Sequence, residues 1–234
     1  MCGIVGYIGN RKAAPILIKG LKNLEYRGYD SAGICTINNK EVLLKKDIGK
    51  IEEIDKKVNL ADLEGNIGIS HCRWATHGSV TKENAHPHTD CSGKIGIVHN
   101  GIIENYNELK NELKKKGHKF SSETDTEIIA HLIEEYYKGD FKEAVLKALK
   151  KLDGSYALGI IHSEHDELIA ARNEHSSTVF VSQTPVSKWH SLMPNSTIAD
   201  AILDRIVHSA MRVELKGESH RKTKNAQNEK AVEA

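Results

Sequence analysis

The order of the apolar segments is the feature that most limits the possible fold. Strand-like segments dominate the first hundred residues, three helical segments then follow in a row, and two more strand-like segments come after them. Several strands, such as CGIVGYIG at 2–9 and KIGIVHNGII at 94–103, are apolar at nearly every position, which is typical of strands buried on both faces. A sheet buried on both faces needs a layer on each side. The order therefore predicts an α+β fold with sheets stacked between helical layers.

Periodicity and turn residues place the individual elements. The segments 31–38 and 41–48 flank Asn39-Lys40 and predict a hairpin. The strand at 94–103 is expected to carry His99 and Asn100 at its tip, where functional side chains often gather. Helices are predicted after residue 11 up to Gly28, at 51–62, and then consecutively at 104–117, 125–138 and 141–152, with a closing strand pair at 155–163 and 167–173.

Composition excludes several classes of protein. The 234 residues hold 33 Lys and Arg against 32 Asp and Glu, a net charge of +1, so a nucleic-acid partner is not expected. No apolar run approaches the ~20 residues of a membrane-spanning helix. The four cysteines form no CxxC pair and follow no secretory leader, which predicts reduced thiols in a cytoplasmic protein; they are Cys2, Cys35, Cys72 and Cys91.

Cys2 stands directly behind the initiator methionine. Removal of Met1 would leave a thiol and a free α-amine on one residue, and an α-amine with a pKa near ~8 accepts a proton at neutral pH far better than a lysine does. One residue would then serve as both nucleophile and base. The alternative is a small apolar residue that opens a buried strand. Position alone favours that alternative.

The stretch SHCRWATHGSVTKENAHPHTD at 70–90 is rich in histidine and suggests a metal site at first sight. It has neither HExxH nor a His/Cys/Cys pattern to complete a tetrahedral shell, so no metal is expected. Arg73 offers a planar fork that suits a carboxylate, and Thr76 and His77 add hydrogen-bonding groups nearby. For His86 and His88 a role in the local loop is the favoured interpretation.

Two further motifs have both a catalytic and a structural interpretation. In HNG, the Asn100 amide and the Gly101 backbone N–H are suitable donors for an oxyanion hole, although Asn-Gly is also a common turn. In SSETDTE at 121–127, spacing alone favours a helix N-cap followed by an acidic first turn.

Taken together, MCGIVGYIG, LEYRGYDSAG, RWATHG, NAHPH, HNGIIENY and SETDTE resemble, in order, the glutaminase half of the glutamine–fructose-6-phosphate aminotransferases. The resemblance covers about 1–172. YRGYDSAG and RWATHG are similar to the sugar-amidating branch of the class II glutamine amidotransferases rather than to the purine or asparagine branches.

This resemblance implies an N-terminal-nucleophile hydrolase fold, a four-layer αββα sandwich, that hydrolyses L-glutamine to glutamate and ammonia without a cofactor. Met1 would be removed. The implied roles are Cys2 as nucleophile, Asn100 and Gly101 as oxyanion hole, Arg73, Thr76 and His77 around the glutamine α-carboxylate, Asp125 at its α-ammonium, and Trp74 as the ammonia gate.

The C-terminal part has a different character. Residues 175–224 resemble the end of ATP-binding transposition helper proteins, but the sequence contains no GxxxxGK[ST] phosphate loop. The expected organisation is an amidotransferase domain at 1–173 that lacks its last strands, a mainly helical helper-like fragment at 174–219 and a disordered tail at 220–234. No sugar-phosphate isomerase region is recognised, so fructose 6-phosphate is not expected as a substrate, and no oligomer is predicted. An inactive fusion product and a nucleic-acid-associated helper fragment remain the alternatives.

Overall fold

The computed structural model describes residues 2–74 and 79–173 of the chain, without the side chain of Arg27. The expected helper-like fragment at 174–219 and the tail at 220–234 lie outside the described residues. Among the described helices, none combines the length and the apolar character needed to cross a bilayer.

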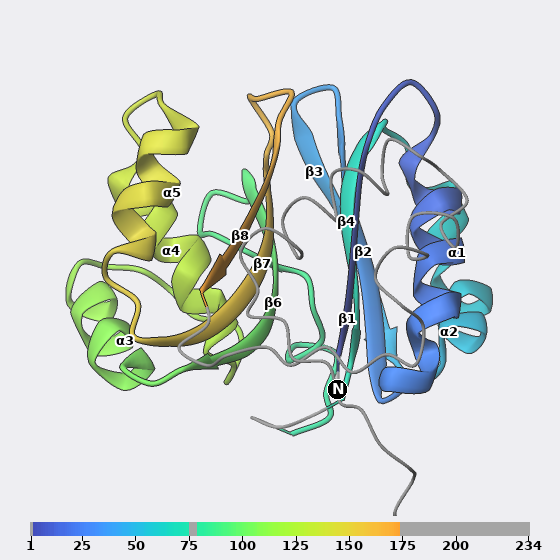
Figure 1. The fold of residues 1–234 in the computed structure, drawn as a ribbon, viewed down its shortest axis with the longest axis horizontal. Helices are drawn as coiled ribbons and strands as arrows, with labels where there is room; N and C mark the ends of the chain where they lie inside the picture. Colours follow the sequence, from blue (N-terminus) through green and yellow to red (C-terminus); the bar gives the residue numbers. More distant parts are fainter. Residues whose placement is uncertain (1, 75–78, 174–234) are drawn as a thin grey trace, which may run out of the picture. The chain divides into compact units, whose positions relative to one another are not determined.

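The first sheet contains the N-terminal strand and lies next to two helices (Figure 1). Its four strands are all antiparallel in the order β1-β4-β2-β3: β1 (Gly3–Ile8), β2 (Ser31–Asn38), β3 (Glu41–Ile48) and β4 (Ile67–Arg73). The predicted hairpin is confirmed, with Asn39 and Lys40 at φ of 50° and 61°. Positive φ at both central residues matches the twist of the two strands that the turn connects.

The second sheet is also antiparallel, in the order β5-β6-β7-β8: β5 (His88–Thr89), β6 (Ile95–Ile103), β7 (Gly154–His162) and β8 (Leu168–Asn173). The prediction that His99 and Asn100 lie at the tip of their strand is wrong. β6 continues to Ile103, and the two residues pair with Leu158 and Ala157 of β7. The pairing persists because Gly101 adopts a φ of 135°, which a residue with a side chain rarely reaches.

Helices cover the outer face of each sheet (Figure 1). They are α1 (Ala13–Leu24) and α2 (Ile51–Val58) on the first sheet, and α3 (Tyr106–Lys115), α4 (Thr126–Tyr136) and α5 (Phe141–Leu149) on the second. The helix predicted at 51–62 is too long. Asn59 adopts a left-handed conformation at φ 50° and its N–H bonds to the Asp55 carbonyl, so α2 ends there and a 3-10 turn, Leu60–Asp62, follows.

Three apolar clusters fill the spaces between four layers. Leu17, Leu21 and Ile54 belong to the cluster between the first sheet and its helices, and Ile129 and Phe141 to the cluster on the second sheet. A third cluster joins the inner faces of the two sheets through Cys35, Ile69, Val98 and Ile161. The predicted α+β fold, an αββα sandwich, is therefore confirmed for the described residues.

Candidate active site

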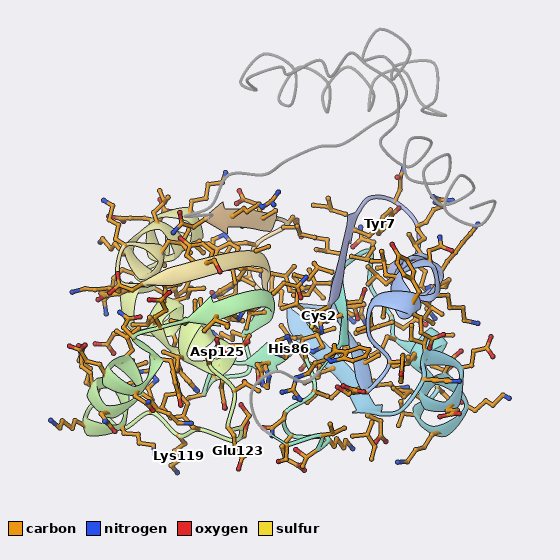
Figure 2. All side chains as sticks on the ribbon, turned by 60° about the horizontal axis from the view of Figure 1, so that its bottom comes forward. Cys2, Tyr7, His86, Lys119, Glu123 and Asp125 are labelled. Carbon is orange, nitrogen blue, oxygen red and sulfur yellow. The ribbon has the colours of Figure 1, made fainter. Side chains whose placement is uncertain are left out.

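A cavity of about 590 Å³ collects most of the residues singled out in the sequence. Cys2 precedes β1, Arg73 ends β4, Asn100 and Gly101 lie within β6, and Asp125 precedes α4. Figure 2 labels Cys2, Asp125 and His86, which reach this region from different elements. Segments far apart in the chain therefore contribute to one site. Pairing of β1 with β4 brings Cys2 to Arg73, the Asn100 side chain contacts the Cys2 backbone, and Asp125 contacts the end of β6.

The Cys2 sulfur lies against the peptide that follows Arg73. Trp74 N–H donates to Cys2 Sγ over 3.2 Å, and the thiol is 3.5 Å from the Trp74 carbonyl oxygen. The β1–β4 register, with Gly3 opposite Cys72, brings the two segments into this contact.

In the segment LEYRGYDSAG, position 28 has no room for a side chain. A Cβ at this position would lie 2.8 Å from the Arg73 carbonyl carbon and 2.9 Å from Trp74 N. The next segment also supports the same peptide, since Asp30 N–H donates to the Arg73 carbonyl over 3.1 Å. The close approach of Gly28 therefore allows the peptide to take the position in which it meets the Cys2 sulfur.

Asn100 and Gly101 lie side by side in β6 rather than in a turn. Asn100 Nδ2 donates to the Cys2 carbonyl over 3.3 Å, and its Oδ1 lies 2.8 Å from His71 Nε2. Burial lowers the pKa of His71 to about 4, so the ring is neutral at pH 7 and Nε2–H donates to Oδ1. This bond fixes the amide with its NH₂ group toward Cys2. Sequence reasoning gave His71 no such role, because only the β4–β6 contact reveals it.

Gly101 has no room for a side chain. A Cβ would lie 2.0 Å from the Ser155 carbonyl oxygen on β7, and the φ of 135° disfavours any other residue. The backbone of β6 can therefore remain exposed to the cavity at this position.

The cavity also contains a buried positive and a buried negative side chain. Arg73 is 4% exposed and Asp125 7% exposed. Burial lowers the pKa of Arg73, while the neighbouring Cys2, Asp30 and Asp125 oppose that shift. Asp125 occupies the N-cap position of α4 but makes no side-chain cap bond; instead Oδ2 accepts the Ile103 N–H over 2.9 Å. The capping interpretation of this carboxylate is therefore wrong, and the carboxylate belongs to the wall of the cavity.

Three buried histidines form a cluster that begins at the wall of the cavity, which His71 and His86 line. The ring centroids of His71 and His86 are 4.3 Å apart, and those of His86 and His88 are 4.8 Å apart. Burial lowers the pKa of His86 and of His88 well below the usual range. His86 Nε2 contacts the Thr126 hydroxyl, and His88 Nε2 contacts the Thr124 hydroxyl. These neutral rings hold the 86–88 segment against the start of α4, which fits the structural role predicted for His86 and His88.

The remaining predicted residues are placed as follows. Trp74 is 45% exposed and packs edge-on against Tyr29, with ring centroids 5.7 Å apart. Thr76 and His77 lie outside the described residues.

Comparison with known proteins identifies the family. A family model described as "Glutamine amidotransferase domain" matches residues 71–187, half of the chain. The chain belongs to the glutamine amidotransferase family. Over 177 residues it is 58% identical to the glutamine–fructose-6-phosphate aminotransferase (isomerizing) of Thermococcus kodakarensis, a match that covers 74% of this chain and 29% of that protein. The corresponding enzyme of Methanococcus maripaludis is 60% identical over 183 residues, 74% of this chain and 30% of the relative.

Solved structures agree with the observed fold. The glutamine phosphoribosylpyrophosphate amidotransferase of B. subtilis, solved with ADP and GMP, matches with a TM-score of 0.65 and 30% identity, covering 74% of this chain and 37% of that one. Identity to the aminotransferases is about twice as high, which confirms the predicted resemblance of this amidotransferase domain to the sugar-amidating branch. The chain spans less than a third of the length of these curated aminotransferases.

A second family model, described as "IstB-like ATP binding protein", matches residues 162–228. The predicted helper-like resemblance is therefore confirmed, but the match begins earlier than the expected residue 175. It overlaps the amidotransferase match over 162–187 and includes β8. β8 pairs with β7 from Tyr156↔Asn173 to Ile161↔Leu168, so this strand is part of the amidotransferase sandwich whichever family its sequence resembles.

Proposed function

We propose that the amidotransferase domain hydrolyses the side-chain amide of L-glutamine, with Cys2 as nucleophile. The observation that carries this proposal is the single cavity that contains the Cys2 sulfur, the Asn100–Gly101 segment and the buried pair Arg73 and Asp125. A thiol, two candidate oxyanion donors and a site for both charges of a free amino acid are the groups that this reaction needs.

The two buried charges suit the free amino acid rather than a peptide. The Arg73 guanidinium would hold the α-carboxylate, with Thr76 and His77 as further donors, and the Asp125 carboxylate would hold the α-ammonium. A zwitterion bound between them places its side-chain amide toward the remaining part of the cavity, where Cys2 lies. A glutamine residue within a peptide lacks both free charges and would offer neither Arg73 nor Asp125 an oppositely charged group.

The chemistry proceeds by acyl transfer. The α-amine of Cys2, free once Met1 is removed, takes the thiol proton; the sulfur bonds to the amide carbon, and the oxygen gains a negative charge that Asn100 Nδ2–H and Gly101 N–H stabilise. The amine then protonates the leaving nitrogen and ammonia departs. Water, deprotonated by the same amine, attacks the thioester, the carbon–sulfur bond breaks, and glutamate leaves.

Further assignments rest on the relatives. Trp74 borders the cavity and follows the peptide that contacts Cys2, so we propose it as the group that controls the exit of ammonia. The names of the relatives include fructose 6-phosphate as a substrate of those enzymes, but the chain matches less than a third of their length. We therefore propose only the glutamine half of their reaction for this domain.

We also propose that the amidotransferase domain ends near residue 173, followed by the helper-like fragment at 174–219 and a terminal tail at 220–234. ATP binding by the fragment is not proposed, because the sequence has no GxxxxGK[ST] motif. The four cysteines form no disulfide, and two of them, Cys35 and Cys72, are buried as thiols. This supports a reducing compartment, for which we propose the cytoplasm.

The decisive experiment is intact-mass spectrometry of the full chain before and after incubation with a diazoketone analogue of glutamine. We expect a mass that lacks Met1, one adduct per chain, and protection by L-glutamine. Cys2→Ala should form no adduct, whereas Cys91→Ser, which removes an exposed thiol, should form it normally. Retention of Met1, or an adduct that persists in Cys2→Ala, would contradict the proposal. Glutamate release is then the activity to measure.

A further inference from the structure

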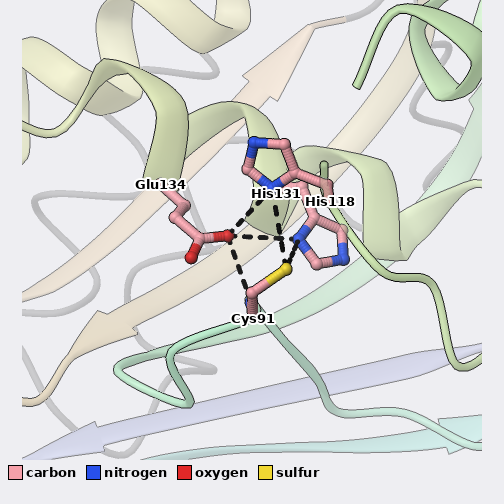
Figure 3. A group of neighbouring side chains, drawn as sticks. All are labelled: Cys91, His118, His131 and Glu134. Atoms are coloured by element: carbon pink, nitrogen blue, oxygen red, sulfur yellow. Dashed lines mark hydrogen bonds and ion pairs between the residues drawn. The ribbon is translucent and has the colours of Figure 1, made fainter. Parts of the chain in front are cut away.

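A second cluster of chemically active side chains lies on the second sheet, outside the cavity. Cys91 follows β5, His118 follows α3, and His131 and Glu134 occupy one face of α4 (Figure 3). Their four candidate ligand atoms all lie within 4.8 Å of one another. The expectation of no metal considered only the histidines of 70–90 and not this group. Three separate segments must meet to form it, so no local spacing pattern predicts it.

Four of the six distances between the candidate ligand atoms are close to the edges of a tetrahedron around a metal ion. Cys91 Sγ is 3.5 Å from His131 Nδ1 and 3.7 Å from His118 Nδ1. Glu134 Oε2 is 3.1 Å from His118 Nδ1 and 3.2 Å from His131 Nδ1. Bonds of about 2.0–2.3 Å from tetrahedral zinc set neighbouring nitrogen, oxygen and sulfur ligands about 3.3–3.6 Å apart.

The far nitrogen of each ring faces a carboxylate. His118 Nε2 is 3.3 Å from Glu135 Oε2, and the other oxygen of Glu135 is 3.1 Å from Lys116 Nζ. His131 is 1% exposed; its Nε2 has no hydrogen-bond partner within normal distance and lies 3.7 Å from Glu127 Oε1. Metal-binding histidines commonly donate their second N–H to a carboxylate in this way.

A cation between the four side chains suits their hydrogen-bond roles. If each Nε2–H points at its carboxylate, each neutral ring directs the Nδ1 lone pair at the Glu134 carboxylate and the Cys91 sulfur. Two lone pairs, a carboxylate and a sulfur repel one another unless a positive charge lies between them.

We propose that Cys91, His118, His131 and Glu134 bind one divalent metal ion, and that the ion is zinc. A Cys/His₂/Glu set combines ligands that zinc accepts, and two anionic ligands balance its charge. All four positions are supplied by the protein, which is typical of a structural rather than a catalytic zinc. The ion would link the turn after β5 and the α3–α4 connection to α4, the helix that Asp125 precedes.

The test uses the full chain in a Cys2→Ala background, which removes the other accessible thiol. Zinc per chain is measured by elemental analysis after purification without chelators. The metal-free protein is then titrated with Co²⁺, which reports thiolate coordination by a charge-transfer absorption band. We expect about one equivalent of metal, and we expect Cys91→Ser to lose the thiolate band and His118→Ala to lose stoichiometric binding.

His165→Ala provides a matched control, because His165 is a half-buried histidine that bonds to Tyr137 outside the cluster. It should bind metal like the parent. Free zinc at about one hundred times the dissociation constant of the site should also raise the melting temperature of the parent by about 5–10 °C. This measurement does not require any variant to fold. Absence of stoichiometric metal and of this shift, or a thiolate band that survives Cys91→Ser, would overturn the proposal. None of these measurements depends on glutamine hydrolysis.

Discussion

At the scale of single residues, the candidate site depends on backbone geometry as much as on reactive side chains. Cys2, Arg73 and Asp125 are the side chains proposed to react with and bind glutamine, whereas Gly28 and Gly101 allow close approach of the main chain. His71 adds no charge at neutral pH because burial lowers its pKa to about 4, but it orients the Asn100 amide. The motif HNG made Asn100 and Gly101 candidates for an oxyanion hole. The positive φ of residue 101 and its close contact with β7 explain why this residue is glycine.

Gly101→Ala should abolish labelling of Cys2 by the diazoketone and destabilise the fold. The new Cβ would lie 2.0 Å from the Ser155 carbonyl oxygen in addition to straining φ, so we expect a loss of about 2–4 kcal/mol in the free energy of unfolding, measured in urea. Gly117→Ala is the control, because it has a φ of 98° with no heavy atom within 4 Å of the new Cβ. It should cost about 1 kcal/mol and leave labelling intact. Equal effects of the two variants would refute the steric argument.

At the scale of elements, the strands position the site by their register. The pairs Gly3↔Cys72 and Ser31↔Arg73 bring β1 and β2 onto the two sides of β4 at the end where Trp74 N–H meets the Cys2 sulfur. Most of the strands were predicted from the sequence because their apolar runs are local, whereas the two-residue β5 was not. The end of α2 at Asn59 and the position of His99 and Asn100 inside β6 were not predicted, since they depend on the conformation of a single residue and on pairing with β7.

Gly28→Ala should displace the Arg73–Trp74 peptide and slow labelling of Cys2 by at least tenfold. The position has extended backbone, so the effect is steric, and we expect a stability cost of about 1–3 kcal/mol. Gly68→Ala is matched to it, with a Cβ 2.7 Å from the Cys35 carbonyl oxygen but five residues before Arg73 in β4. It should lose similar stability while its folded fraction still reacts. Normal labelling of Gly28→Ala would show that the peptide position is not critical.

At the scale of the whole molecule, the sandwich buries an unusual group of neutral histidines between its sheets and α4. His71, His86, His88 and His99 all have their pKa lowered by burial. In the unfolded chain they bind protons near pH ~6.5, whereas the folded chain resists protonation to lower pH. The unfolded state therefore binds more protons in acid, and stability falls as the pH drops from about 6.5.

We expect the urea midpoint of the full chain to be flat near pH 7–8 and to fall steeply from pH 6.5 toward pH 4. His71 alone would account for roughly 3 kcal/mol by pH 4, since its pKa shifts from 6.5 to about 4. His71→Gln should reduce this slope relative to the parent. A midpoint that does not change between pH 7 and pH 5 would show that these histidines titrate normally in the folded state.

The sequence by itself determined the fold class, the family and the identity of the main candidate residues, because strand and helix periodicity and short motifs are local properties of the chain. Tertiary structure alone decided that Asp125 contacts β6 instead of capping α4, that His71 orients Asn100, and that Cys91, His118, His131 and Glu134 converge. These facts depend on sheet register and on packing between segments 22 to 43 residues apart, and nothing in the spacing of a sequence specifies which distant side chains share a few ångströms of space.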